Sequence, residues 1–335
     1  MKLTRTTTLA ALFTAGVLSL TACGQGSVSG DGGDASPTAG ETTASQGELT
    51  AVSVGVLPIA PSVGVYYGVE KGIFEEHGFD VTLETNNSGA AMLPAVSNGQ
   101  VDFGVGNPLS VMTAADRGLE MKIVSGYSNS LAEGKDVAGV VTRADSGIES
   151  FADLAGKTTA INALKTQGDL TIMEAAEKEG ADPQALRFSE LPFPDMPAQL
   201  ERGNADAVWV PEPFLSRLLA DDANRLVGYS FQEAIPGMPT MVTFTSGAKA
   251  SEDPEMVREF REAMTDALEA AEADDEGVRT MLSEFIDMPQ DVAQSLTMEE
   301  LSGELPREEL TKIGEAATKY EFISKAPNEE QLYLD

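Results

Sequence analysis

From residue 51 onward, short apolar runs alternate with longer stretches of helical periodicity. The strand-like runs, the first of which alternates valines, cover 52–56, 81–83, 103–105 and 123–124. The stretches with helical spacing between them cover 62–76, 90–97 and 108–117, and each is followed within two residues by a glycine. An alternation of strands and helices predicts an α/β fold with a mostly parallel sheet flanked by helices.

The same order of elements returns after residue 157. Strand-like runs at 158–162, 186–188 and 207–210 alternate with helical stretches at 168–179 and 196–202. Four pairs of matching positions are each 104 residues apart: Met92 and Met196, Val96 and Leu200, Gly99 and Gly203, and Asp102 and Asp206. We interpret this internal repeat as two similar lobes.

After a strand-like run at 241–244 the chain becomes helical. Met256, Phe260, Met264 and Leu268 recur at a spacing of four residues and are expected to face a core. Further helices are expected at 277–285 and 307–319, packed back on the first lobe. We therefore predict a first lobe of residues 49–136 and 244–335 and a second lobe of 137–243, joined by two crossings that form a hinge.

The amino terminus has the pattern of a targeting segment. Lys2 and Arg5 precede a mostly apolar stretch of 12 residues, 9–20, whereas a membrane-spanning helix needs about 20. The following residues, Leu20 to Gly24, resemble a bacterial lipobox and predict cleavage after residue 22 and lipidation of Cys23. The alternative is a buried structural cysteine after an ordinary signal peptide. Residues 23–48, rich in Gly, Ser and Thr, are expected to form the lipid anchor and a flexible tether.

The composition excludes several classes of function. With 54 acidic and 22 basic residues the net charge is −32, which argues against nucleic-acid binding. One cysteine excludes an intramolecular disulfide, and one histidine excludes a multi-histidine metal centre within the chain. We therefore expect no cofactor and no metal. The abundant acids leave a paired-carboxylate hydrolase open, although no motif specifies one.

The signal, the tether and the two repeated lobes resemble a substrate-binding lipoprotein of an ABC importer. Four segments carry a more specific resemblance to the nitrate/sulfonate/taurine family, which also includes binders of thiamine pyrimidine precursors: 67–74 with Gly78, 97–104, 153–157 and 209–214. The resemblance implies a periplasmic-binding-protein-like fold that captures a small solute between two closing lobes and delivers it to permease and ATPase subunits. It implies a non-catalytic, extracytoplasmic protein held at the membrane through Cys23.

Other functions remain open at this point. The solute is either sulfonate-, nitrate- or taurine-like, or a pyrimidine precursor or other aromatic heterocycle. Related pyrimidine-synthesising enzymes use a histidine and a cysteine-rich motif, whereas this chain has only His77 and Cys23. A surface adhesin or signalling lipoprotein is the third class.

The resemblance places the ligand at the carboxyl ends of strands and the amino ends of helices, where unpaired N–H groups and the helix dipole favour ligand binding. The first-lobe candidates are Pro58, Ser62, Asn87, Ser88, Gly89, Asn107 and Tyr127. The second-lobe candidates are Lys165, Thr166, Gln167, Gly168, Phe193, Trp209 and Glu212.

Several of these candidates have a second interpretation. Asn87, Ser88 and Gly89 fit a simple helix cap, and Trp209 fits a strand core as well as an aromatic wall. Lys165 either pairs with an anion or faces solvent. Glu212 either accepts a hydrogen bond from a ligand amine, braces the hinge or lies in water.

Overall fold

The computed structural model describes residues 48–334. The predicted signal peptide 1–22, Cys23 and the rest of the tether up to residue 47 lie outside the described residues. Within the described range, no helix combines the length and the apolar character needed to cross a membrane.

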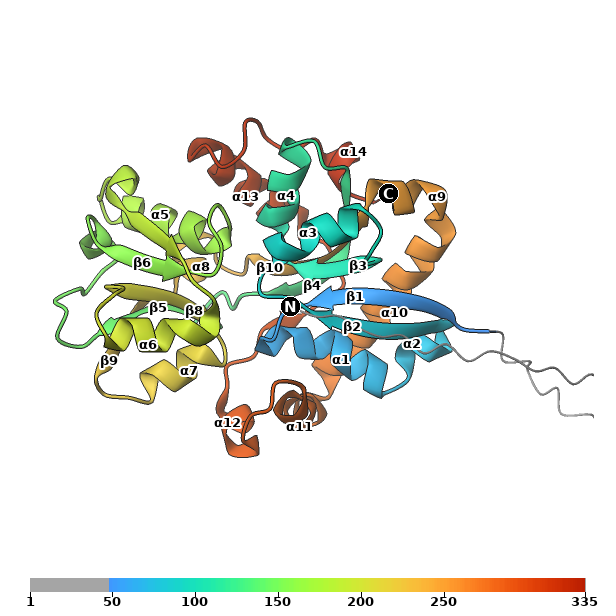
Figure 1. Ribbon diagram of the computed structural model, residues 1–335, viewed down its shortest axis with the longest axis horizontal. Helices are drawn as coiled ribbons and strands as arrows, with labels where there is room; N and C mark the ends of the chain where they lie inside the picture. Colours follow the sequence, from blue (N-terminus) through green and yellow to red (C-terminus); the bar gives the residue numbers. More distant parts are fainter. Residues whose placement is uncertain (1–47, 335) are drawn as a thin grey trace, which may run out of the picture. The chain divides into compact units, whose positions relative to one another are not determined.

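The first lobe is built on a six-stranded sheet in the order β11-β4-β10-β3-β1-β2 (Figure 1). Its strands are β1 (Thr50–Val56), β2 (Phe79–Thr85), β3 (Phe103–Gly106), β4 (Met121–Asn129), β10 (Pro239–Ser246) and β11 (Glu300–Leu301). β1 is parallel to β2 and β3, whereas β10 is antiparallel to β3 and β4. The sheet is therefore mixed, but it is not mostly parallel as the sequence predicted, because β11 is also antiparallel to β4 and the antiparallel pairs outnumber the parallel ones.

Helices cover both faces of this sheet. One layer contains α1 (Val63–Glu70), α2 (Ile73–Glu76) and α10 (Pro254–Ala273), which pack on one another. The opposite layer contains α3 (Gly89–Ser97), α4 (Pro108–Asp116) and α13 (Arg307–Lys319) (Figure 1). The expected single helix over 62–76 is divided, because Gly72 adopts a φ of 73° that ends one helix and starts the next.

Phe260 shows why α10 packs where it does. Its ring stacks on Phe103 of β3 with centroids 3.8 Å apart, and it also contacts Phe74 and Phe79. Phe260, Met264 and Leu268 are fully buried. The apolar stripe predicted from the sequence is thus the core of the first lobe.

The second lobe is built on a five-stranded sheet in the order β7-β6-β8-β5-β9. Its strands are β5 (Ala138–Arg143), β6 (Thr158–Ile161), β7 (Arg187–Glu190), β8 (Ala207–Pro211) and β9 (Asn224–Gly228). Its helices are α5 (Gln167–Lys178), α6 (Met196–Glu201), α7 (Phe214–Leu219) and α8 (Ser230–Ala234). β6 is parallel to β7 and β8, and β5 is antiparallel to β8 and β9.

The remaining helices are short turns or belong to the carboxyl-terminal part. The 3₁₀ turns are η1 (Ala60–Ser62), η2 (Ala152–Leu154), η3 (Pro183–Ala185) and η4 (Phe193–Asp195). The other α-helices are α9 (Gly247–Glu252), α11 (Asp275–Phe285), α12 (Gln290–Ser295) and α14 (Glu329–Leu332). α11 and α12 precede β11 and bring the chain back to the edge of the first sheet.

The internal repeat corresponds to equivalent positions in the two lobes. Met92 and Met196 are both fully buried, and Gly99 and Gly203 both take a left-handed φ, of 73° and 71°. The chain crosses out of the first lobe between β4 and β5. It returns before Pro239 rather than at 243, because the whole of β10 is buried and hydrogen-bonded in the first sheet.

Candidate functional site

A cavity of about 50 Å³ lies where the two lobes meet, large enough for a small chemical group or a few water molecules. From the first lobe it is lined by Leu57, Ile59, Gly89, Gly106, Asn107, Thr240, Met241 and Glu299. From the second lobe it is lined by Asn162, Thr166, Gln167, Gly168, Phe193, Trp209, Pro211 and Phe231. Seven of the predicted residues thus come together: Gly89, Asn107, Thr166, Gln167, Gly168, Phe193 and Trp209.

Two helix starts of the first lobe converge on the cavity. Ser88 caps α3 by accepting a hydrogen bond from Ala91 N at 3.1 Å, and Asn107 caps α4 by accepting one from Ser110 N at 2.8 Å. A Cβ atom on Gly106 would lie 3.2 Å from the Cα of Gly89. The two glycines therefore allow the helix starts to approach each other closely.

The start of α5 completes the polar side of the cavity from the second lobe. The Asp169 carboxylate accepts hydrogen bonds from Lys165 N at 2.7 Å and Thr166 N at 2.8 Å. Burial raises the pKa of Asp169 to about 7, although these backbone hydrogen bonds oppose the rise. An internal carboxyl group thus already occupies part of the positive end of this helix.

Gln167 reaches from α5 to the first lobe. Its Nε2 donates to the carbonyl of Pro239 at 2.6 Å, which joins the two lobes beside the cavity. Its Oε1 is buried and has no hydrogen-bond partner within residues 48–334. An unpaired buried oxygen at this position is suited to accept a hydrogen bond from a donor on a bound solute.

Three aromatic rings form the apolar wall. The ring of Trp209 lies 5.9 Å from that of Phe193 and 5.5 Å from that of Phe231, and its Nε1 donates to Ser230 Oγ at 3.0 Å. A Cβ atom on Gly168 would lie 3.0 Å from the indole, so this glycine lets the start of α5 rest on the ring. Trp209 therefore lines the cavity as a wall while also belonging to the strand core.

Among the described residues that line the cavity, Glu299 is the one acid, and it was not predicted from the sequence. Its side chain is only 8% exposed, and its Oε2 accepts a hydrogen bond from Thr240 Oγ1 at 2.6 Å. Ser128 Oγ lies 2.8 Å from the same hydroxyl oxygen. Burial raises the pKa of Glu299 to about 7, while the hydrogen bonds from Ser128 and Thr240 act in the opposite direction.

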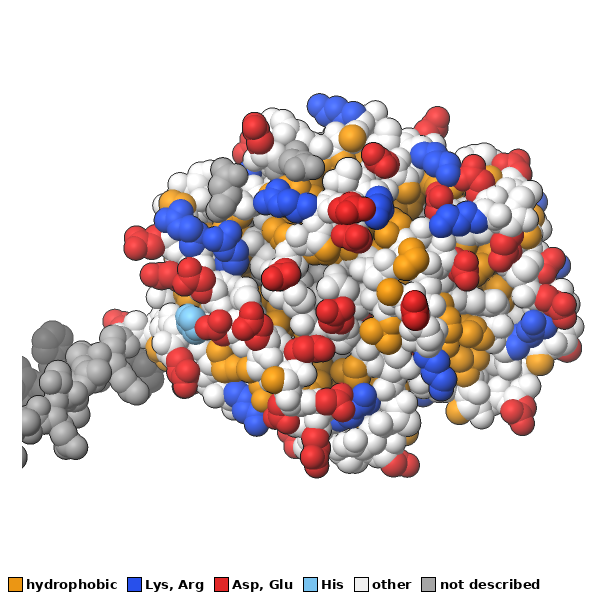
Figure 2. Space-filling model, turned by 180° about the vertical axis from the view of Figure 1, so that it is seen from behind, with side chains coloured by type: hydrophobic (Ala, Val, Ile, Leu, Met, Phe, Trp, Pro, Cys, Tyr) orange, Lys and Arg blue, Asp and Glu red, His pale blue; other side chains and the backbone are white. Residues whose placement is uncertain are grey.

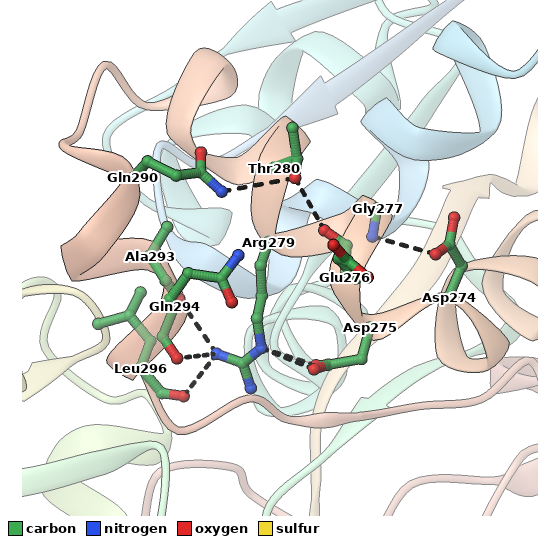
Figure 3. Close-up of polar contacts among 10 residues, drawn as sticks. All are labelled: Asp274, Asp275, Glu276, Gly277, Arg279, Thr280, Gln290, Ala293, Gln294 and Leu296. Atoms are coloured by element: carbon green, nitrogen blue, oxygen red, sulfur yellow. Dashed lines mark hydrogen bonds and ion pairs between the residues drawn. The ribbon is translucent and has the colours of Figure 1, made fainter.

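Arg279 holds the segment that carries Glu299 (Figure 3). Its Nη1 donates to the carbonyls of Ala293 at 3.0 Å and Leu296 at 2.9 Å, and also to that of Gln294 at 3.3 Å. Its Nε lies 2.8 Å from both carboxylate oxygens of Asp275. The guanidinium therefore fixes the end of α12 against the start of α11 and directs the chain toward residue 299.

Five predicted residues of the first lobe do not line the cavity. Ser88 is the cap described above, Pro58 and Asn87 are exposed, and Ser62 is buried within η1. The Tyr127 hydroxyl donates to Pro61 O at 3.0 Å and accepts from Val65 N at 2.9 Å. Tyr127 thus anchors the loop that follows β1.

Lys165 and Glu212 also lie outside the lining. Lys165 is exposed, and its Nζ donates to the carbonyl of Glu321 at 3.1 Å, on the first lobe. The Glu212 carboxylate accepts hydrogen bonds from Ser216 N at 3.0 Å and Ser216 Oγ at 2.7 Å. Its backbone N–H donates to Val137 O and its carbonyl accepts from Ala60 N, so these contacts favour the bracing role near the crossings.

The lining contains residues that the sequence pattern did not single out: Asn162, Phe231, Thr240, Met241 and Glu299. Among the described residues that line it, none is Lys, Arg or His. Residues 48–334 contain no group of three or more His, Cys, Asp or Glu side chains arranged to hold a metal ion.

The sequence comparison identifies the family. Residues 60–277 match the model of the NMT1/THI5-like family. The chain belongs to this family. No curated protein was found to match it in sequence.

Solved structures of solute-binding proteins share the fold. The periplasmic aliphatic sulphonate binding protein SsuA from Escherichia coli is 16% identical, with a TM-score of 0.69 over 84% of this chain and 96% of that one. The alkanesulfonate-binding protein SsuA from Xanthomonas axonopodis pv. citri, bound to MOPS, is 16% identical, with a TM-score of 0.70 and coverages of 84% and 96%. The periplasmic nitrate-binding protein NrtA from Synechocystis is 12% identical, with a TM-score of 0.69 and coverages of 85% and 86%. The predicted two-lobed α/β fold is confirmed.

Proposed function

We propose that this member of the NMT1/THI5-like family is the extracytoplasmic solute-binding component of an ABC importer. The observation that carries the proposal is the cavity lined by both lobes, which are joined by two crossings. A solute that places one of its groups in this small cavity contacts both lobes at once and stabilises their closed arrangement by its differential affinity. The closed form is then the one that permease and ATPase subunits recognise.

Two classes of solute follow from the lining. The convergent helix starts at Gly89, Asn107 and Thr166 support a sulfonate-, nitrate- or taurine-like solute, in keeping with the proteins that share the fold. The three aromatic rings, and the lack of a basic residue in the part of the lining that the structure describes, favour the second class, a pyrimidine precursor or another aromatic heterocycle. The lining as a whole supports the second class better, because a bare anion would meet no cation there.

Binding without catalysis is the proposal for this cavity. The chain's one histidine, His77, lies outside the lining, with its Nε2 2.8 Å from Asp266 Oδ2 of α10. Among the described lining residues, the histidine and the cysteine-rich motif of the related pyrimidine-synthesising enzymes therefore have no counterpart. Thr240, Gln167 and Asn107 instead provide hydrogen-bonding groups suited to holding a solute.

Lipidation of Cys23 remains part of the proposal. The lipobox-like segment before it and the polar composition of 24–48 support an anchor and a tether at the outer face of the membrane. Cys23→Ala is expected to leave the protein unlipidated and released from the membrane fraction. A variant that stays tightly membrane-bound would contradict the anchor.

Calorimetric titration of the full chain tests the solute-binding proposal. The panel contains nitrate, alkanesulfonates, taurine, aminopyrimidines and flavins. We expect saturable binding of one class, accompanied by compaction in small-angle X-ray scattering and by loss of uptake of that solute when the gene is deleted. Binding of a solute that is then chemically converted would support an enzyme instead.

A further inference from the structure

Glu299 is a buried carboxyl group in the cavity lining. It lies at the end of the segment that runs from α12 to β11, at the edge of the first sheet. Thr240 of β10 donates a hydrogen bond to it, and Ser128 of β4 contacts the same Thr240 hydroxyl. The carboxyl group is thus oriented by the Thr240 hydroxyl, which Ser128 supports, before any solute enters.

The described lining residues around Glu299 provide no positive charge. No Lys, Arg or His belongs to the described lining, and the other carboxyl group that acts on Glu299 electrostatically is Asp136, which is also buried. Removing a carboxylate from water without a cation is costly. A solute that brings a nitrogen-bound hydrogen or a positive charge supplies the missing partner.

The opposite wall suits the same kind of solute. Trp209, Phe193 and Phe231 present aromatic rings to the cavity. Such rings pack against flat unsaturated groups and attract cations through their faces. An anion finds less support, because Asp169 already occupies part of the positive end of α5.

The charge of the whole chain acts in the same direction. The net charge is −32, and Figure 2 shows acidic side chains spread over one face among fewer Lys and Arg. A field of this sign raises the local concentration of cations and lowers that of anions, with screening over about 8 Å at physiological salt.

We propose that Glu299 determines which solutes the cavity accepts, by accepting a hydrogen bond from a solute that carries an amine, an amidine or a ring N–H. This inference rests on the proposed function and assigns the solute class of the same cavity. Glu212, the acid that the sequence suggested for this task, is bonded to Ser216 outside the lining. Glu299 takes the role that the sequence pattern suggested for Glu212.

Two pairs of matched probes test the assignment on the full chain. Benzamidinium and benzoate have the same shape and opposite charge, and taurine and ethanesulfonate differ by one ammonium group. Calorimetry is expected to show tighter binding of the nitrogen-bearing member of each pair, by about tenfold or more. Glu299→Gln keeps the shape and removes the charge, so it should remove most of this preference.

Two further variants keep the test independent of folding. Thr240→Val removes the hydroxyl that orients Glu299 and should weaken the preference less than Glu299→Gln does. Glu300→Gln changes the neighbouring exposed glutamate and should leave the preference unchanged. Circular dichroism and thermal melting of each variant show whether it remains folded.

The outcomes separate this inference from the proposed function. Tighter binding of benzoate or ethanesulfonate, equal binding within both pairs, no binding of benzamidinium at millimolar concentration, or a preference that survives in Glu299→Gln overturns the role of Glu299. If nitrate or sulfonates bind instead, the importer proposal stands and only the solute class falls. If no solute of the wider panel binds, the proposed function itself fails.

Discussion

Asp102 and Asp206 perform the same structural task in the two lobes. The Oδ2 of Asp102 accepts a hydrogen bond from Ser53 N of β1, and the Oδ2 of Asp206 accepts one from Thr158 N of β6, both at 2.8 Å. In each lobe this contact ties the turn before a buried strand, β3 or β8, to the parallel strand beside it, β1 or β6. The Asp that recurs after 104 residues therefore makes the same hydrogen bond with a backbone N–H in both lobes.

Asn substitutions at these two positions are expected to differ in cost. Lys249 Nζ lies 2.5 Å from Asp102 Oδ1. Burial acts to raise the pKa of Asp102, but hydrogen bonds from Lys249 and Ser53 outweigh it and lower the pKa. Asp102→Asn should therefore lower the free energy of unfolding by about 1–2 kcal/mol more than Asp206→Asn.

The pH dependence follows from the sign of this shift. Because the folded pKa is lowered, the contribution of Asp102 is present above the unfolded pKa of about 4 and is lost as pH falls through the folded value. Urea unfolding at pH 7 and at pH 3 should show the difference between the two variants at pH 7 and a smaller one at pH 3. Equal losses in the free energy of unfolding for the two variants at pH 7 would contradict the role of Lys249.

Glu299 should give the opposite pH dependence. Burial raises its pKa to about 7. Between the ordinary glutamate value and pH 7 the unfolded chain releases the proton while the folded chain keeps it, so stability falls as pH rises through this range. We expect Glu299 to lower the free energy of unfolding of the parent protein by about 1–3 kcal/mol between pH 5 and pH 7.5, and we expect Glu299→Gln to remove this contribution.

Burial also raises the pKa of Asp169, so part of the fall in stability with rising pH persists in Glu299→Gln. Glu300→Gln is the matched control, because Glu300 is the next residue along the chain and its side chain is exposed. Urea unfolding at several pH values measures the slope. A slope in Glu299→Gln equal to that of the control would show that Glu299 titrates near its ordinary value.

A polar contact between α13 and α5 joins the two lobes away from the cavity. Lys319 Nζ lies 3.1 Å from Glu174 Oε2 and also pairs with Glu177, and the Tyr320 hydroxyl lies 2.8 Å from Glu174 Oε2. Lys319→Ala should favour separated lobes and weaken solute binding several-fold, with a change of about 0–1 kcal/mol in apo stability.

Lys312→Ala is the control on the same helix, because Lys312 pairs with Glu308 and Glu309 of α13 itself. Small-angle X-ray scattering should show larger apo dimensions for Lys319→Ala than for Lys312→Ala. Identical dimensions and identical solute affinity in the two variants would show that the contact does not bias closure.

Arg279 is expected to act on both stability and binding. Arg279→Ala removes the guanidinium hydrogen bonds to the carbonyls of Ala293 and Leu296 and loosens the segment that leads to Glu299. The loss should lower the free energy of unfolding by about 1–3 kcal/mol and weaken solute binding. Arg279→Lys should recover only part of the lost stability and binding, since an ammonium group lacks the planar arrangement of donors of a guanidinium group.

The exposed Arg258 of α10 provides the control for this substitution. Chemical unfolding and calorimetry on Arg258→Ala should match the parent protein. An Arg279→Ala protein with unchanged stability and unchanged affinity would show that the segment is held by its other contacts.

Glu212→Gln distinguishes bracing from solute contact. Burial raises the pKa of Glu212, whereas hydrogen bonds from Ser216 and from the Thr297 backbone oppose the rise. Since these contacts lie at the crossings between the lobes, we expect a lower apo melting temperature and little direct loss of affinity. A tenfold loss of affinity with an unchanged melting temperature would instead return Glu212 to the solute site.

The amino-acid sequence by itself determined the α/β class, the two similar lobes and most of the helix starts at the cavity. These features depend on local patterns: period-2 and period-3.6 apolar spacing, glycines that end helices, and caps such as Asn107. Each is visible within a single segment of chain, and the repeat after 104 residues shows the same pattern a second time, in the other lobe.

Only the tertiary structure decided which acid reaches the solute cavity. Glu212 follows a strand end and had a local reason to be chosen, but the packing at the crossings uses it internally. Glu299 precedes a strand of two residues that has no sequence pattern of its own, and its partners Ser128 and Thr240 are 112 residues apart. A contact among three distant segments depends on the closing of the sheet between β4, β10 and β11, and no local periodicity encodes it.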